Sequence, residues 1–187
     1  PLEIQGADWE TDPKGIDTGG WGLRLKTEDI AKFGQLYLQK GLWNGKRILS
    51  ESWIKEATTA TMPASAKAED ATNDWLQGYG SQFWRCQHHA YRGDGAFGQY
   101  CVVIPEKDMV VAITSETSDM QAILNLIWKY LIPANQLTRS QNDQMATKKL
   151  TQKLNALAFP PLVSPLTSTW VQKMNQKPFV VEKNTLN

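Results

Sequence analysis

The chain has 187 residues and a formal net charge of +1, with 41% hydrophobic and 21% charged residues. These values are ordinary for a globular protein and exclude a disordered or fibrous chain. No apolar run reaches the roughly 18 residues of a transmembrane helix, so we expect no membrane span. Residues 138–187 carry seven basic and two acidic residues. Their dispersed pattern, without alternating aromatic residues, predicts no nucleic-acid partner.

The cysteines and histidines are too few for a metal centre or a disulfide scaffold. Cys86 and Cys101 are the only cysteines, and His88 and His89 are the only histidines and are adjacent. This excludes a four-thiolate zinc site and a histidine ligand set at helical spacing. We therefore expect no metal and no cofactor. Two free buried thiols are the default expectation, and a cross-strand disulfide is the alternative.

The first elements in chain order are a loop and an amphipathic helix. Residues 1–22 are rich in Gly, Asp and Pro and predict an ordered loop. Thr27 is a suitable N-cap for a helix over about 28–40, in which apolar residues recur at helical spacing and which Gly41 ends. Asn44-Gly45 then predicts a tight turn.

Ser50 is expected to cap a short helix that runs to about Ala57, and residues 58–76 read as a surface excursion. Three β-rich runs follow at 79–87, 98–104 and 109–114, the last two separated by Pro105-Glu106-Lys107-Asp108.

A helix over about 119–131 is expected next, ended by Pro133. A weaker polar helix covers 144–157, and the prolines after it predict an extended segment. The last residues, 176–187, could begin a strand. The domain prediction is 1–135 for the main domain and 136–187 for a polar helix and linker. That the linker leads to a truncated C-terminal domain is implied only by the family resemblance given below.

The stretch "RGDGAFGQYCVVIP", which starts at Arg92, admits three interpretations. Arg92-Gly93-Asp94 is a cell-adhesion tripeptide, but Tyr91 and Phe97 beside it favour a packed hairpin end. Gly93 to Gly98 spells the G-x-G-x-x-G of dinucleotide sites, which requires a following helix, whereas "QYCVVIP" predicts a strand. A β-hairpin with a Gly-rich turn fits both flanks. A turn at residues 93 and 94 would place Cys86 opposite Cys101.

Two segments carry a family resemblance. "TGGWGLRLKTEDIAKFGQLYLQKGLWNGKRILSESWIKEAT" and "GAFGQYCVVIPEKDMVVAITS" resemble parts of serine hydrolases related to class C β-lactamases and penicillin-binding proteins. The resemblance covers about residues 1–135. It implies a partial α+β (α/β sandwich) domain of the β-lactamase/transpeptidase type, with an antiparallel sheet flanked by helices. By resemblance alone, it also implies a location outside the cytoplasm.

Such enzymes use a Ser-x-x-Lys nucleophile, a Tyr-x-Asn motif and a third motif, Lys-Thr-Gly or a variant. By resemblance, Gly93-Asp94-Gly95 stands at the third-motif position, and Ala96 supplies the oxyanion-hole N–H. The usual cation is missing, and a shift of register by one residue would place Asp94 or Arg92 there. An aspartate would repel the carboxylate of a β-lactam, so a neutral ester, amide or peptide bond is the better substrate.

The other two motifs are not found. Ser52-Trp53-Ile54-Lys55 matches Ser-x-x-Lys but lies where the family has an ordinary surface helix. Ser140-Gln141-Asn142 matches Ser-x-Asn but follows the third motif, and no Tyr-x-Asn occurs. The sequence thus predicts a hydrolase fragment that lacks its nucleophile and is inactive alone. A non-catalytic ligand-binding or scaffold member of the family is the alternative.

The expected partners are a small-molecule or peptide substrate and a covering chain. We expect the helix over 28–40 to belong to a neighbouring helical region, which would leave one sheet face apolar and exposed. The missing N-terminal part of the domain, another chain or another copy would then cover that face.

Overall fold

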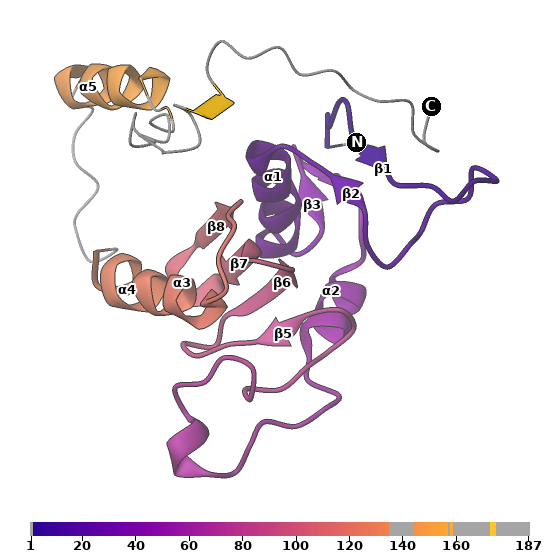
Figure 1. Cartoon of the computed structure of the whole chain (residues 1–187). Coiled ribbons are helices and arrows are strands. Elements are labelled where there is room, and N and C mark those ends of the chain that lie inside the picture. Colours follow the sequence, from indigo (N-terminus) through magenta and orange to yellow (C-terminus); the bar gives the residue numbers. More distant parts are fainter. Residues whose placement is uncertain (1, 135–143, 157, 159–172, 175–187) are drawn as a thin grey trace. The chain divides into compact units, whose positions relative to one another are not determined.

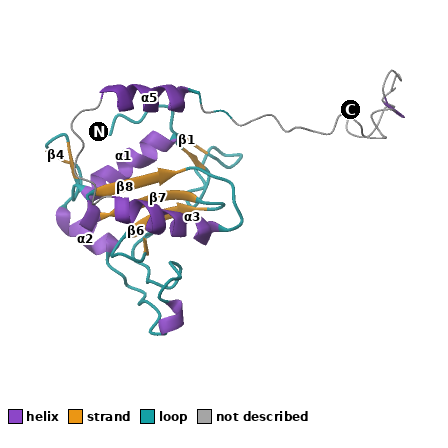
Figure 2. Ribbon diagram, turned by 90° about the vertical axis from the view of Figure 1, so that its left-hand side faces the viewer, coloured by secondary structure: helices purple, strands orange, loops and turns teal. Residues whose placement is uncertain are grey.

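The computed structural model describes residues 2–134, 144–156, 158 and 173–174. The chain forms two compact units, Pro1–Thr138 and Arg139–Asn187, and each is considered by itself. In the first unit a four-stranded antiparallel sheet has the order β5-β6-β7-β8. Its strands are β5 (Trp84–Arg85), β6 (Tyr91–Gly95), β7 (Gln99–Ile104) and β8 (Met109–Ile113). Helices lie on both faces of this sheet (Figures 1 and 2). The expected α+β class is therefore confirmed.

One sheet face packs against the helix that follows β8. Strand side chains alternate between faces, so Tyr100, Val102 and Ile104 of β7 all point to the same side. There they meet Leu124 of α3 (Met120–Leu126) and Trp128, which follows it, in the larger core cluster. The strand predicted at 109–114 and the helix predicted over about 119–131 are both present here, as β8 and as the helix that begins with α3.

The opposite face packs against α1 (Thr27–Leu38), which corrects the prediction of an exposed apolar face. Gly34 lets the helix approach the sheet closely, because a Cβ at Gly34 would lie 2.5 Å from Val110 Cγ1 and 2.8 Å from Cys101 Sγ. The predicted helix is present, but it contacts β7 and β8 directly. Thr27 is also its first residue rather than its cap, and the Thr27 hydroxyl bonds to the Thr114 hydroxyl at 2.9 Å.

The short elements between α1 and the sheet form as the turn and cap residues predict. Strands β3 (Leu42–Trp43) and β4 (Lys46–Arg47) flank Asn44 and Gly45, which both have positive φ, as a type I′ turn requires. The Ser50 hydroxyl accepts a hydrogen bond from the Trp53 amide and caps α2 (Glu51–Thr58). Two further strands, β1 (Asp8–Trp9) and β2 (Leu23–Arg24), pair within the N-terminal loop.

The predicted strand over 79–87 is largely wrong. Only β5 forms as a strand, and Tyr79 makes isolated antiparallel bridges with Met62 and Trp84. The Gly80 amide bonds to the Phe83 carbonyl, and Gln82 has a φ of 65°, so the chain turns where the pattern predicted extension. The excursion before it contains a short 3-10 helix, η1 (Ala68–Asp70), and projects from the β5 end of the sheet (Figure 1).

Helical structure in this unit runs to Ala134, one residue past Pro133, where the described part of the unit stops. After α3 the chain makes a π-helical turn, Ile127–Leu131, and continues into α4 (Ile132–Ala134). The 3-10 turn η2 (Pro105–Lys107) and left-handed Asp108 connect β7 to β8 as expected.

In the second unit α5 (Gln144–Asn155) confirms the predicted polar helix. The predicted domain boundary at 135, the proline-rich extended segment and the strand beginning in 176–187 lie outside the described residues. Within the part of the chain that the structure describes, no helix has the length and apolar character needed to cross a membrane.

Candidate functional site

The Gly-rich segment is a strand followed by a turn, and the turn lies later than predicted. Gly93, Asp94 and Gly95 belong to β6 and pair with Cys101, Tyr100 and Gln99 of β7. The connection is Ala96-Phe97-Gly98, closed by a hydrogen bond from the Gly98 amide to the Gly95 carbonyl at 3.3 Å. The predicted turn at 93 and 94 is therefore wrong. No helix follows Gly98, so the dinucleotide interpretation is also excluded.

The carbonyl groups of this turn are held by the segment after β8. The Ser115 hydroxyl donates to the carbonyl oxygens of Phe97 and Gly98 at 3.1 and 2.7 Å, and the Thr117 amide donates to the Phe97 carbonyl at 3.0 Å. The Gln99 side-chain amide donates to the Ala96 carbonyl at 3.2 Å. Among the described residues, the Ala96 amide donates no hydrogen bond, and Ala96 is exposed.

Arg92 and Asp94 form a buried ion pair behind the turn. Both residues pair across the sheet with residues of the α3 face, Val102 and Tyr100, so both side chains point to that face. Arg92 Nε donates to Asp94 Oδ2 at 2.9 Å, and the exposed side-chain fractions are 0% and 10%. Burial raises the pKa of the Asp94 carboxyl, while the Arg92 charge lowers it. The Arg92 charge is thus already paired within the protein.

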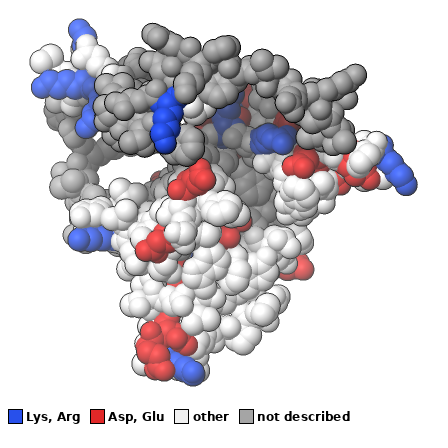
Figure 3. Space-filling view, in the orientation of Figure 1, with Lys and Arg blue, Asp and Glu red and all other residues white. Residues whose placement is uncertain are grey.

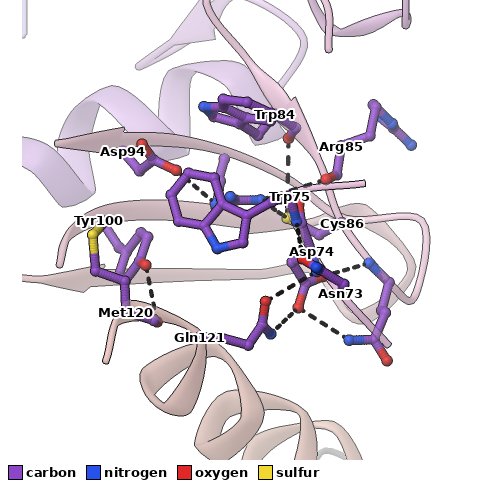
Figure 4. Close-up of polar contacts among 12 residues, drawn as sticks. Asn73, Asp74, Trp75, Trp84, Arg85, Cys86, Asp94, Tyr100, Met120 and Gln121 are labelled. Atoms are coloured by element: carbon purple, nitrogen blue, oxygen red, sulfur yellow. Dashed lines mark hydrogen bonds and ion pairs between the residues drawn. The ribbon is translucent and has the colours of Figure 1, made fainter. Parts of the chain in front are cut away.

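Two tryptophans enclose the Arg92 guanidinium. Its carbon lies 4.6 Å from the Trp75 ring centroid and 5.6 Å from that of Trp84, within cation–π distance. Nη1 donates to the Asp74 carbonyl at 2.9 Å and to Cys86 Sγ at 3.2 Å. Nη2 is buried and has no hydrogen-bond partner among the residues that the structure describes. Figure 4 labels Trp75, Trp84 and Asp94 in this part of the sheet.

Asp74 connects the excursion to the core. It is fully buried, and its carboxylate accepts from the Gln87 amide at 2.8 Å. The same carboxylate accepts from the side chains of Gln87, Gln121 and Trp128 at 3.0, 2.7 and 2.8 Å. These contacts, part of which Figure 4 draws, join residues far apart in the sequence. A buried carboxylate with four donors is satisfied, so we assign it a structural role.

An aromatic groove with a volume of about 270 Å³ opens beside these tryptophans. The Trp75, Tyr79 and Trp84 side chains line it, together with residues of the excursion: Met62, Pro63, Ala64, Ser65, Leu76 and Gly78. The loop is ordered by backbone bonds between Met62 and Tyr79 in both directions at 3.0 Å. Uncharged surface predominates in the lower half of Figure 3, over the part of the chain that contains this excursion.

Both cysteines are free and buried, as the default prediction had it. They lie on different faces of the sheet, because Cys86 belongs to the α3 cluster while the Cys101 thiol donates to the Ile30 carbonyl of α1 at 3.4 Å. Burial raises the pKa of Cys86 to about 11 and that of Cys101 to about 12. The predicted opposition of the two cysteines is therefore wrong.

The two segments that match serine motifs by chance do not form a nucleophilic site in the described residues. Ser52 and Lys55 lie exposed on α2, and the Ser52 hydroxyl donates to the Ser50 hydroxyl at 3.1 Å. Ser140-Gln141-Asn142 lies outside the described residues. Across the described ranges, no cluster of three or more His, Cys, Asp or Glu residues could hold a metal ion.

Sequence reasoning missed the residues that support the turn and the tryptophans. Asp74, Gln121 and Trp128 meet only in the folded chain, and no local spacing connects them. Trp75 lies in a segment that reads as polar surface loop. The only usable signal was the aromatic content around Tyr79 and Trp84.

Comparisons with known proteins bear on the fold. No family model and no curated protein sequence matches this chain. The solved structure "Putative 6-aminohexanoate-dimer hydrolase from Bacillus anthracis" is similar with a TM-score of 0.53 and 23% identity over 71% of this chain and 35% of that chain. A structure described as a "putative beta-lactamase from Bacteroides dorei DSM 17855" has a TM-score of 0.49 and 14% identity, over 69% and 47% of the two chains. This chain thus spans about a third of the Bacillus protein, and over the matched region it has the same α+β fold.

Proposed function

We propose that the first unit is the C-terminal part of a β-lactamase-related serine hydrolase, in which β6 and the Ala96–Gly98 turn wall the substrate pocket. The enzyme cleaves an ester, amide or peptide bond through an acyl-enzyme, and its nucleophile is encoded outside these residues. The family resemblance and the fold shared with a protein named as a hydrolase support this proposal. The arrangement of the turn is the observation that carries it.

Two features of the turn support a role as an oxyanion site. Its carbonyl oxygens are engaged by Ser115, Thr117 and Gln99, so the backbone is fixed before a substrate binds. Ala96 is exposed, and we assign its amide as the donor to the oxygen that becomes negative during acyl transfer. A fixed donor at that position stabilises the transition state without reorganisation, and one such donor is typically worth about 100- to 1,000-fold in rate.

The charges near the turn favour an uncharged substrate. A carboxylate-bearing substrate needs a free cation at the third-motif position. Arg92 is buried against two indole rings and paired with Asp94, so it offers no such charge. Gly93 leaves open space on the side of β6 that faces away from this pair, because a Cβ there would meet no atom within 4 Å. A nucleophile contributed by the missing part would approach through such space.

Labelling with a fluorophosphonate probe tests this proposal. The longest natural polypeptide that carries this chain should be labelled at a serine outside residues 1–187, and the 187-residue chain alone should not be labelled. The Ser52→Ala variant of the long polypeptide is the matched control and should be labelled like the parent. Labelling of the short chain at Ser52, or an unlabelled long polypeptide that is correctly folded, would contradict the proposal.

The aromatic groove favours a second candidate, a non-catalytic ligand-binding member of the same family. Trp75, Tyr79 and Trp84 present ring surface to a groove of about 270 Å³, a lining that suits peptide or sugar rings. Titration of the 187-residue chain with short peptidoglycan-like peptides or oligosaccharides, followed by tryptophan fluorescence, tests it. Saturable binding that Trp84→Ala abolishes, with no acylation of the long polypeptide, would favour this candidate over the enzyme.

A further inference from the structure

Phe97 occupies a backbone conformation that its side chain disfavours. It is the third residue of the turn closed by Gly95 and Gly98, and its φ is 65°. A positive φ at this turn position is usually taken by Gly or Asn, and it is an outlier for a bulky residue. Gly98, next to it, must be glycine, because a Cβ would lie 2.5 Å from Ser115 Oγ and 2.8 Å from Ile123 Cδ1.

The Phe97 ring contributes little to the packing of the fold. The side chain is 59% exposed, and neither core cluster includes it. The Ser115 and Thr117 bonds hold the Phe97 carbonyl, which any residue would provide. A single exposed aromatic residue is unremarkable by itself. An exposed aromatic ring on a strained backbone is different, because both features disfavour it at this position. Strain of this kind concentrates at sites that contact ligands.

We propose that Phe97 is a substrate-contacting residue whose ring forms an apolar wall beside the Ala96 amide. This inference rests on the proposed function and specifies its substrate. Phe97 directly follows the amide that would hold the scissile carbonyl, so its ring lies next to a group attached to that carbonyl. The charges of Arg92 and Asp94 are paired with each other, so the group is an uncharged aromatic or branched aliphatic one.

Three variants of the long polypeptide separate binding from strain. Phe97→Gly and Phe97→Asn remove the ring and suit a positive φ, whereas Phe97→Ala removes the ring and keeps the unfavourable Cβ. Each is assayed for kcat/KM on two pairs of esters. One pair varies the acyl group, 4-nitrophenyl acetate against 4-nitrophenyl phenylacetate. The other varies the alcohol, methyl butyrate against benzyl butyrate.

All three variants should lose about 10-fold or more of the parent preference for the larger apolar group in at least one pair. The smaller ester of that pair should lose less of its kcat/KM than the larger ester does. Phe97→Gly should also raise the Tm of the 187-residue chain by about 2–4 °C, while Phe97→Ala should not raise it. Loss of preference together with a gain in stability is the result expected of a ring retained for binding.

The possible failures are distinguishable. If the parent hydrolyses the esters and no variant changes its preference in either pair, the Phe97 inference is overturned and the proposed function stands. If Phe97→Gly lowers the Tm, the ring serves the fold and the inference is again wrong. If the folded parent hydrolyses no ester and takes no fluorophosphonate label, the proposed function itself fails, and this inference fails with it.

Discussion

Replacement of Arg92 by methionine tests the ion pair behind the turn. Methionine retains much of the apolar stem but removes the charge and every donor. Arg92 is fully buried, and its guanidinium donates to Asp94, to the Asp74 carbonyl and to Cys86 Sγ. Removing one partner of a buried pair leaves the other charge uncompensated, which costs about 3–5 kcal/mol. We therefore expect Arg92→Met to lower the free energy of unfolding by this amount, out of a total that is typically about 5–15 kcal/mol.

The loss should depend on pH in a direction that Asp94 determines. Burial raises the pKa of this carboxyl and Arg92 lowers it, so removal of Arg92 raises the pKa further. A carboxyl whose pKa is higher in the folded than in the unfolded state favours folding while it is protonated. That contribution is complete below the unfolded-state pKa and is lost as the pH rises through the folded-state pKa. The destabilisation of Arg92→Met should therefore grow from about pH 4 upward.

Urea unfolding of the 187-residue chain at two pH values, for example about pH 5 and about pH 8, measures both effects. The double variant Arg92→Met with Asp94→Asn is the matched control, because it removes the uncompensated charge together with its partner. It should be more stable than the single variant at the higher pH, and its pH dependence should be flatter. An Arg92→Met variant within about 1 kcal/mol of the parent, or a double variant no more stable than the single one, would refute the reasoning.

Three further results are expected. Gly34→Ala should destabilise the chain by about 1–3 kcal/mol in urea unfolding, because its Cβ would lie 2.5 Å from Val110; an unchanged midpoint would contradict the close approach of α1. His89→Gly should raise stability by about 1 kcal/mol, because φ is 53° there; a lower Tm would show that the His89 side chain matters more than the strain. Burial raises the pKa of Cys86 to about 11 and that of Cys101 to about 12. A disulfide reagent should therefore modify neither thiol at neutral pH until urea unfolds the chain, and rapid reaction of the folded chain would contradict their burial.

The elements predicted well are those whose signals are local. The helix up to Gly41, the Asn44-Gly45 turn and the Ser50 cap depend on residues within a few positions of one another. The strands at 99–104 and 109–113 were also predicted to within a residue or so, because continuous β-branched runs bounded by a proline turn admit few alternatives.

The candidate site was predicted less well, since its geometry depends on long-range contacts. The segment from Gly93 to Gly95 read as a turn because glycine favours turns. Pairing with β7 extends it as a strand, and Ser115 and Thr117 place the turn three residues later. Gly34 likewise read as one more residue of an amphipathic helix, and only its contacts with Val110 and Cys101 show that α1 covers the sheet.

The sequence alone determined the α+β class, the main hairpins and helices, and the segment in which the candidate site would lie, because these follow from propensity, capping and periodicity along the chain. Only the tertiary structure decided which strand residues face which helix, that Arg92 is neutralised by Asp94 between two tryptophans, and that Phe97 stands exposed at the turn. Those outcomes depend on strand register and on side chains up to 87 positions apart, as between Thr27 and Thr114, and no local pattern encodes them.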